Sequence, residues 1–591
     1  MSERLSYDGP AFQRPRSSRV LPVGALLRWK ATAFGGQSSD ALETGRTRLL
    51  VASLVFVCAF AVIGVRLLDL ALFTGAPQRI APQAGFAHVE PQVRADIVDR
   101  NGVVLATTLP RASLHANPRE IRNPKFVAAQ LSAILPDLSE GEVSAKLAMD
   151  RSFIWIKRGL SPRQQYQINR LGVPGLSFRE EERRTYPQGE LTAHIVGFTD
   201  VDNQGLAGLE QGFDELLSGS KTPLRLSLDL RVQHILTDEL SRSMEEFRAI
   251  GAAGVVMDAH TGEIVAMASL PSFDPNQPGS ASSDSRFNRA TLGTYEMGSV
   301  FKIFSTAAAL DSGEVALYDN FDVSDPIRAA RFTIRDYRPK EGKLSVPEIF
   351  MHSSNIGTVH LAMKTGTEIQ RSALARLGLT TPMSLELPET GTPQLPTPWR
   401  EISTMTVSYG HGLSVTPVQL TAGVAATING GLMPKPTVLA RDDDALVPNQ
   451  RVFSERTSRD MRRLMRLVVE HGTGGNADAE GYLVGGKTGT ANKQVGGTYQ
   501  RNARISSFVG AFPMDEPRYV VFAMVDEPKG HSGTFGYATG GWVAAPVVHN
   551  VVSRMAPMLG IQPRPHTITP PMEEHPLLLH AVGEDFRIAA Q

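Results

Sequence analysis

Short apolar runs and one longer, almost wholly apolar segment stand out among the polar positions in the second half of the chain, and they predict strands and a helix, respectively. Residues 254–267 form two apolar runs across a glycine-containing turn, which is typical of a β-hairpin. The apolar runs 505–512 and 519–525 predict two further strands. Residues 300–310 are apolar on almost every side and are followed by Gly313, so they predict a buried helix.

The same patterns predict how the chain is divided. Candidate helices cover 124–135, 161–171 and 542–558, and a glycine-rich stretch lies at 205–212. We expect five parts: 1–48, a polar, arginine-rich tail; 49–73, an apolar anchor; 74–224, a mixed region; 225–562, a larger second region; and 563–591, a proline-rich, loose tail.

The run Leu49–Val65 contains no charged residue and lies near the lower limit of the length that crosses a bilayer. Apolar residues continue to Phe73, and no small-residue cleavage site follows. Several arginines precede the run, which places the N-terminus in the cytoplasm. The sequence therefore predicts a single uncleaved membrane helix, with everything after residue 73 outside the cytoplasm.

The composition gives no sign of nucleic-acid binding and excludes an intramolecular disulfide. The chain has 591 residues, a formal net charge of zero and 42% apolar residues, so it has room for two or more globular domains and nothing suggests nucleic-acid binding. The single cysteine, Cys58, lies in the apolar run and excludes an intramolecular disulfide. No zinc helix or other metal spacing stands out, so we expect no metal and no cofactor.

The segment Ser299-Val300-Phe301-Lys302 is the strongest chemical signal. A serine and a lysine three residues apart share one face of a helix, which places a nucleophile beside a base. A simpler interpretation makes Ser299 a helix cap and Lys302 a surface residue. A cation in the first turn of a helix is unfavourable, however, and such a local conflict indicates a functional role.

Two further motifs complete a known set of three, an S-x-x-K, an S-x-N and a K-T-G motif in this order. Ser353-Ser354-Asn355 begins a segment that can be helical. Lys487-Thr488-Gly489-Thr490 follows a short apolar run that ends in glycines, where a strand edge can approach a ligand closely.

Three other matches are rejected because of their context. Ser218–Lys221 fits the first motif but lies in a Gly/Ser turn, and Lys364–Thr367 fits the third but comes at the end of the helix that begins near Asn355. Gly481–Thr488 matches the phosphate-binding loop letter for letter. That loop must follow a strand and begin a helix, and neither flank has this character.

The three motifs, with these flanks, resemble the penicillin-binding transpeptidase family. The resemblance extends from about Arg94 to about Gly560, and Met297 and Ala95 depart from the usual pattern, where Pro and Gly are common. Further stretches similar to class B members are Arg94–Gly102 and Arg183–Pro187; those similar to the septal, division-specific type are Tyr409–Leu420 and Gly540–Pro546.

The resemblance implies an α+β multidomain protein with the penicillin-binding transpeptidase fold, an antiparallel sheet flanked by helices. Residues 225–562 would form this transpeptidase domain, 74–224 a non-catalytic pedestal domain, and the N-terminal run one transmembrane helix. No segment resembles the glycan-polymerising domain that some members carry.

The resemblance also implies roles for the motif residues. Ser299 would attack the carbonyl of a D-Ala-D-Ala stem peptide and form an acyl-enzyme, and backbone N–H groups of Ser299 and Thr490 would form the oxyanion hole. The remaining roles are Lys302 as the base; Ser353 as the proton relay, or a helix cap; Asn355 on the donor amide, or in a structural hydrogen bond; Lys487 as a positive field; and Thr488, Gly489 and Thr490 in binding the substrate carboxylate.

Partners and location follow from the same resemblance. The substrates would be peptidoglycan stem peptides and lipid-linked precursor strands, and β-lactams would be trapped at the serine. A membrane glycan polymerase and other division proteins would act beside the chain, at the septum of the bacterial inner membrane. Alternatives are an elongation-type class B transpeptidase, a β-lactamase, a β-lactam-binding sensor and an inactive scaffold.

Overall fold

The computed structural model describes residues 50–65, 94–329, 332–441, 449–495, 498–564, 572 and 575–578. The chain separates into two compact units, 1–88 and 89–591. In the first unit, a helix covers 50–65. No helix within the described ranges combines the length and the apolar character needed to cross a membrane. The rest of the expected anchor, residues 66–73, lies outside the described residues.

The N-terminal part of the second unit is built on a sheet of long strands. The strand order is β3-β2-β1-β7, and β4 also pairs with β2. All pairs are antiparallel except β1 with β7, which is parallel. The strands are β1 (Ile97–Val98), β2 (Val104–Ala116), β3 (Ile154–Leu160), β4 (Leu176–Thr185) and β7 (Leu224–Arg225).

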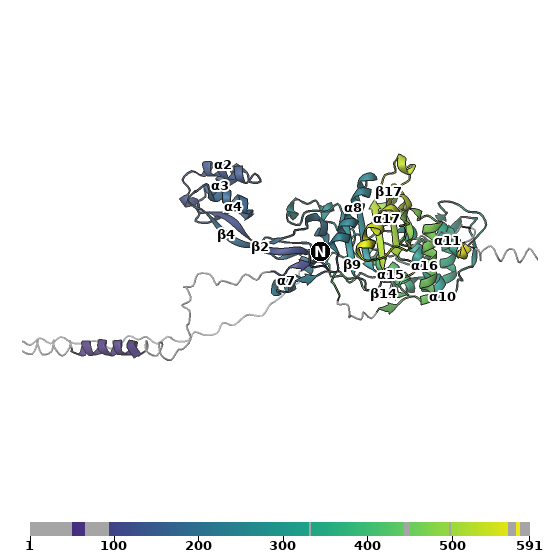
Figure 1. The fold of residues 1–591 in the computed structure, drawn as a ribbon, viewed down its shortest axis with the longest axis horizontal. Coiled ribbons are helices and arrows are strands. Elements are labelled where there is room, and N and C mark those ends of the chain that lie inside the picture. The colour runs from purple at the N-terminus through teal and green to yellow at the C-terminus, as the bar shows by residue number, and fades with distance from the viewer. Residues whose placement is uncertain are drawn as a thin grey trace, which may run out of the picture. The chain divides into compact units, whose positions relative to one another are not determined.

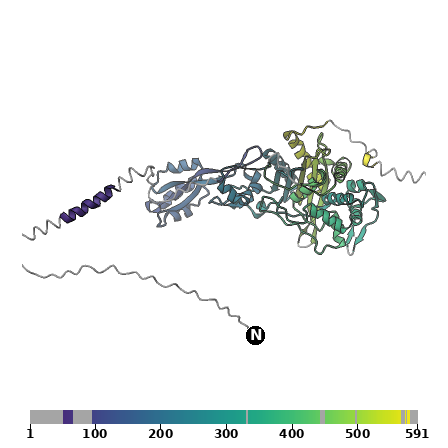
Figure 2. The same ribbon diagram turned by 90° about the horizontal axis from the view of Figure 1, so that it is seen from below.

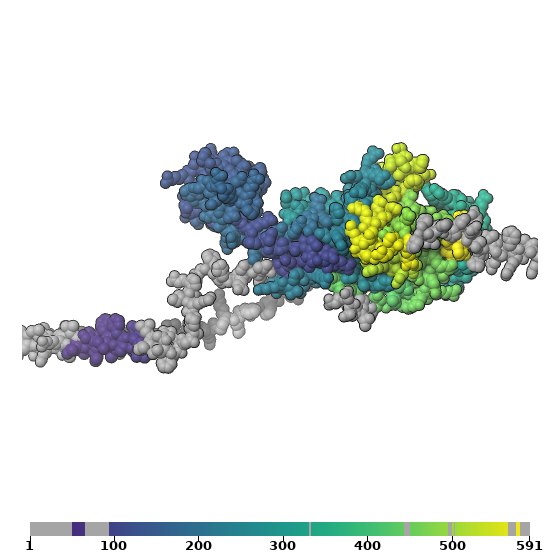
Figure 3. Space-filling model, in the orientation of Figure 1, coloured from purple at the N-terminus to yellow at the C-terminus, as the bar shows by residue number. Residues whose placement is uncertain are grey.

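Three helices cover the far end of this sheet: α2 (Pro124–Ile134), α3 (Glu140–Leu147) and α4 (Pro162–Asn169). Two of them fall where the sequence predicts helices. Side chains from strands and helices, such as Leu114, Leu131 and Ile156, share one small core. The three helices lie beside β2 and β4 in Figure 1 and form a rounded lobe in the space-filling view of Figure 3.

A buried network of ion pairs joins Arg94–Gly102 to Arg183–Pro187, the two stretches that are similar to class B members. Glu210 is fully buried and accepts from Arg94 Nε at 2.5 Å and from Arg184 Nε at 2.6 Å. Arg94 also donates to Asp214 Oδ1 at 2.7 Å. These acidic residues lie on α6 (Gly208–Gly212) and α7 (Asp214–Gly219). A buried charge is tolerated only when it is paired, so the network links the sheet to these helices.

The second sheet has five antiparallel strands in the order β16-β17-β18-β8-β9. The predicted hairpin corresponds to β8 (Gly251–Asp258) and β9 (Ile264–Leu270), and the two later runs to β17 (Thr498–Phe512) and β18 (Tyr519–Asp526). The remaining strand, β16 (Gly485–Val495), begins just before Lys487 and forms one edge of the sheet.

Alternate side chains of this sheet enter two different cores. On β18, Val520 and Phe522 join one cluster, whereas Val521 and Ala523 join the other. This period of two is what a strand buried on both faces requires. Helices α8 (Leu230–Glu246) and α17 (Gly540–Met558) pack on one face, and α15 (Pro417–Ile428) and α16 (Glu455–Glu470) on the other. The antiparallel sheet flanked by helices is therefore confirmed.

The remaining helices gather on the α15 and α16 side of the sheet. The buried helix predicted from 300–310 corresponds to α10 (Lys302–Ser312), and Gly313 ends it in the left-handed conformation at φ 77°. It contacts α12, α13 and α16. Figure 2 shows these green and teal helices beside the yellow strands. The helices are α11 (Val346–His352), α12 (Asn355–Thr365), α13 (Thr367–Arg376) and α14 (Glu401–Ser408).

A short part of the C-terminal segment is packed against the protein. Leu577 is 1% exposed and Leu578 is 8% exposed, and both belong to the core that contains α10. This differs from the loose tail expected for 563–591, because two leucines bury apolar area that proline content alone does not predict. Most of the segment lies outside the described residues.

Candidate active site

Ser299 lies in a short 3-10 turn, Gly298–Phe301, directly before α10. Its side chain is partly exposed, whereas Val300 and Phe301, which follow it in the turn, are buried. Gly298 has φ 52°, and a Cβ there would lie 2.7 Å from Thr490 O. Only glycine fits this close approach, so the backbone holds the serine turn against β16.

Lys302 is fully buried, and its Nζ faces the second motif. It donates to Ser353 O at 2.5 Å and to Asn355 Oδ1 at 2.7 Å, and it lies 3.2 Å from Ser353 Oγ. A neutral amine has two N–H donors and one lone pair. The two shorter contacts use both donors and leave the lone pair to accept a proton.

Ser353 connects the first motif to the third. Its Oγ accepts from Lys487 Nζ at 2.9 Å, on the opposite strand β16. Ser353 ends α11 in the left-handed conformation, at φ 59°. A non-glycine residue seldom adopts this backbone, and it occurs mostly at functional sites and turns. The structure therefore brings Lys302, Ser353, Asn355 and Lys487 into one hydrogen-bonded group.

The two lysines share a site that disfavours positive charge. Burial and the neighbouring charge of Lys487 hold the pKa of Lys302 well below its usual range, although Asp336 opposes this shift. Burial lowers the pKa of Lys487 to about 7. An amine that loses its proton near neutral pH can act as a base, which an ordinary surface lysine cannot.

The third motif forms the edge strand beside the serine turn. Gly489 has no room for a side chain, because a Cβ would lie 2.4 Å from Ser507 Oγ and 2.6 Å from Met297 O. Thr488 Oγ1 lies 2.7 Å from Thr473 Oγ1, and Thr490 Oγ1 accepts from Gly540 N at 3.1 Å. The strand therefore runs close beside the turn that carries Ser299.

The structure supports the rejection of the three other matches. Ser218 is on α7, where its hydroxyl accepts from Arg94 NH1 at 3.0 Å. Lys364 lies at the end of α12 and pairs with Asp319 at 2.8 Å. The phosphate-loop match runs directly into β16 and not into a helix. None of these three stretches therefore competes with the site around Ser299.

One residue of the site, Asp336, belongs to none of the three motifs and is not predicted from the sequence. Asp336 accepts from Asn355 N at 2.5 Å and Ile356 N at 3.0 Å, and from Ser354 Oγ at 2.7 Å. It lies in a polar loop after β12 (Phe332–Ile334), far from the second motif in sequence. Its carboxylate satisfies the first N–H groups of α12 and holds Asn355 in place.

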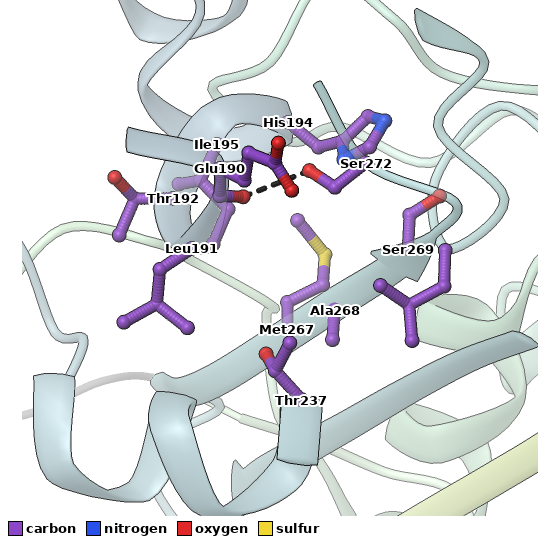
Figure 4. Close-up of a pocket in the computed structure, with 11 residues that line it drawn as sticks. Glu190, Leu191, Thr192, His194, Ile195, Thr237, Met267, Ala268, Ser269 and Ser272 are labelled. Carbon is purple, nitrogen blue, oxygen red and sulfur yellow. Dashed lines mark hydrogen bonds between the residues drawn. The ribbon is translucent and has the colours of Figure 1, made fainter. Parts of the chain in front are cut away.

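A separate small pocket lies between β9, α8 and the segment around His194, and it contains no motif residue. In Figure 4 the side chains of Met267 and Thr237 point toward it, and Ser272 Oγ donates to Glu190 O at 2.8 Å. Burial lowers the pKa of His194 to about 4, so its ring is neutral at physiological pH. The pocket is therefore not part of the candidate active site.

Two family models match the chain. Residues 252–553 match the penicillin binding protein transpeptidase domain, and residues 89–229 match the penicillin-binding protein dimerisation domain. The first match contains all three motifs. The second covers most of the region expected to be a pedestal.

Comparison with individual proteins points the same way. The chain is 39% identical over 553 residues to the probable peptidoglycan D,D-transpeptidase FtsI of Caulobacter vibrioides, covering 91% of this chain and 93% of that one. It is 30% identical over 504 residues to FtsI of Escherichia coli, covering 80% and 84%. A crystal structure of penicillin binding protein 3 from Mycobacterium tuberculosis, complexed with aztreonam, aligns with a TM-score of 0.65 at 25% identity, covering 82% and 99%. The chain therefore belongs to the class B penicillin-binding transpeptidases.

Proposed function

We propose that this protein is a serine D,D-transpeptidase that cross-links peptidoglycan stem peptides during septum synthesis and is acylated by β-lactams. The observation that supports this most directly is the hydrogen-bonded group of the two buried lysines Lys302 and Lys487 with Ser353, in the same site as the partly exposed Ser299. Relatives named peptidoglycan D,D-transpeptidase FtsI support the septal role.

In the proposed acylation, Ser299 Oγ attacks the carbonyl carbon of the penultimate D-Ala while Lys302 Nζ takes the hydroxyl proton. The new C–O bond forms, and the C–N bond to the terminal D-Ala breaks. Ser353 Oγ passes a proton to the departing amine, and Lys302 restores it through the 3.2 Å contact. The lowered pKa of Lys302 favours the neutral amine that the first step needs.

The other motif residues would hold the donor peptide. Lys487 and the hydroxyls of Thr488 and Thr490 attract the terminal carboxylate, and Gly489 lets the strand approach it. Asn355 orients the donor amide. An amine of a second stem then attacks the acyl carbon and gives its proton to Lys302. The Ser299 ester bond breaks as the cross-link forms, and Lys302 passes the proton to Ser299 Oγ.

We further propose that the chain is anchored in the cytoplasmic membrane by residues 49–73, with its catalytic domain outside the cell interior. Large apolar side chains of the described helix are exposed, including Leu50 at 70%, Phe56 at 67% and Phe60 at 68%. Such a surface is stable in lipid and unfavourable in water. A membrane glycan polymerase, other division proteins and lipid-linked strands would meet the protein there.

The test is covalent labelling with a fluorescent penicillin. Ser299→Ala should abolish labelling and leave the unfolding temperature within a few degrees of the wild type, because it removes one partly exposed oxygen. Ser218→Ala is the matched control and should label normally. Persistent labelling of Ser299→Ala would place the nucleophile elsewhere.

A further inference from the structure

Four side chains form a cluster at the entrance to the serine turn, and the mechanism above does not use them. They are Glu296, Tyr409, His411 and Tyr499, which we call the rim cluster. Glu296 precedes Ser299 by three residues, a separation of at most about 11 Å along the chain. Gly298 N donates to Gly410 O at 3.2 Å, so the loop that carries Tyr409 and His411 lies against the same turn.

Glu296 is the only acidic residue of the rim cluster. Its Oε1 accepts from Gly412 N at 2.9 Å and from Tyr499 OH at 3.0 Å, and its Oε2 lies 3.1 Å from the same hydroxyl. Burial raises the pKa of its carboxyl group. Among the described residues no lysine, arginine or histidine forms an ion pair with Glu296. A partly buried carboxylate usually has such a partner.

The aromatic rings stand beside this carboxylate. The ring centroids of Tyr409 and His411 are 5.2 Å apart, and those of His411 and Tyr499 are 5.9 Å apart. Tyr499 is 43% exposed, so its ring can be reached from solvent. Burial and, secondarily, the charge of Lys302 lower the pKa of His411, which leaves its ring neutral and not repulsive to a cation.

A carboxylate with spare lone pairs, flanked by electron-rich rings, is the chemistry that recognises an ammonium group. Two neutral donors occupy part of the Glu296 carboxylate and leave room for a charged donor. We propose that the rim cluster binds a primary ammonium group of the stem peptides and thereby selects substrates that carry one. This inference rests on the proposed transpeptidase function. The ammonium can belong to the donor or to the acceptor stem, and the experiment separates these sources.

The donor arm compares two penicillins that differ by one ammonium group, ampicillin and benzylpenicillin, at pH 6.5, where the ampicillin amine is mostly protonated. The measured quantity is the ratio of their second-order acylation rate constants. If the donor ammonium binds here, Glu296→Gln should lower the ampicillin to benzylpenicillin ratio at least threefold. Tyr499→Leu, which removes a ring at a partly exposed position, should lower it in the same direction.

The acceptor arm uses an acyl-enzyme formed from a thioester donor, which partitions between water and a stem peptide with a free amine. The rate of transfer to the acceptor is measured against the rate of hydrolysis of the same acyl-enzyme. If the acceptor ammonium binds here, Glu296→Gln should raise the acceptor concentration needed for half-maximal transfer at least fivefold. Glu314→Gln, an exposed glutamate after α10, is the matched control and should change neither arm.

A shift in either arm supports the proposal and identifies the source of the ammonium. Unchanged ratios in both arms would overturn it. Equal losses of acylation rate with both penicillins, with no change in either ratio, would also overturn it. Glu296 would then only stabilise the β16–β17 hairpin. A wild-type protein that neither penicillin acylates would instead refute the proposed transpeptidase function, and this inference with it.

Discussion

At the residue scale, two lysines in one buried site act differently because their partners differ. Lys302 donates to two carbonyl-type acceptors, from Ser353 and Asn355, whereas Lys487 donates to the Ser353 hydroxyl and lies over the Phe350 ring. Burial lowers the pKa of both, and the charge of Lys487 lowers that of Lys302 further. The arrangement therefore favours the neutral form of Lys302, whereas Lys487 keeps its proton below about pH 7.

The first prediction at this scale concerns pH. The acylation rate constant should rise with pH as Lys302 loses its proton, and it should fall above about pH 7 as Lys487 becomes neutral. Lys487→Arg should move the falling limb to higher pH, because a guanidinium keeps its proton. Stopped-flow acylation between pH 5 and 10 decides this. A falling limb that stays near pH 7 in the arginine variant would assign it to another group.

The second prediction separates the two K-T-G sequences. Lys487→Ala should reduce acylation at least tenfold, because it removes the cation that faces the substrate carboxylate. Lys364→Ala should leave acylation unchanged and alter the free energy of unfolding by no more than about 0.5 kcal/mol, since the ion pair of this residue is solvent-exposed. Equal defects in the two variants would contradict the assignment of the third motif to Lys487.

At the element scale, the start of α12 depends on a residue from another element. The side chain of Ser354 accepts from Gly357 N, as expected for a helix cap. The N–H groups of Asn355 and Ile356, however, donate to the carboxylate of Asp336. The second motif is therefore held from outside its own helix. Asn355 Nδ2 also donates to Arg335 O at 2.9 Å, which ties the same loop to the site.

We therefore predict that Asp336→Ala destabilises the protein by about 1–3 kcal/mol, the usual cost of leaving buried donors without partners. The acylation rate should fall in addition, because Asn355 and Ser353 lose their fixed position. Denaturant unfolding and penicillin acylation measure the two effects. Asp322→Asn, an exposed carboxylate on β10 (Asn320–Asp322), should change neither. If Asp336→Ala acylates at the wild-type rate, Asp336 does not position the site.

At the scale of the whole molecule, the transpeptidase domain and the N-terminal region are joined by a common hydrophobic core and by hydrogen bonds. Tyr186 and Leu209 belong to the same core cluster as Met257 on β8. Tyr186 N donates to Asn276 Oδ1 at 3.0 Å, and Gly208 N donates to Glu389 Oε1 at 3.0 Å. The N-terminal region is therefore bonded to the catalytic part and can position it relative to partners.

We predict that a chain beginning at Leu226 still reacts with penicillin but cross-links nascent glycan poorly. Penicillin needs only the site around Ser299, whereas cross-linking needs two stems delivered together, a requirement that can account for several kcal/mol of the barrier. Both activities should be measured for the truncated and the full-length protein with glycan supplied. Penicillin labelling serves as the control for folding, and equal cross-linking by the two proteins would refute the dependence on the N-terminal parts.

The three motifs, the strands β8, β9, β17 and β18, and the helices α10 and α17 can all be predicted from the amino-acid sequence. These follow from local patterns, since hydrophobic periods and glycine positions are written directly in the chain. Four features can be seen only in the folded structure: the 3-10 turn at Ser299, the burial of Lys487, the contacts of Asp336 and the position of Glu296. Each of these depends on which distant segments meet, and no local period records such long-range contacts.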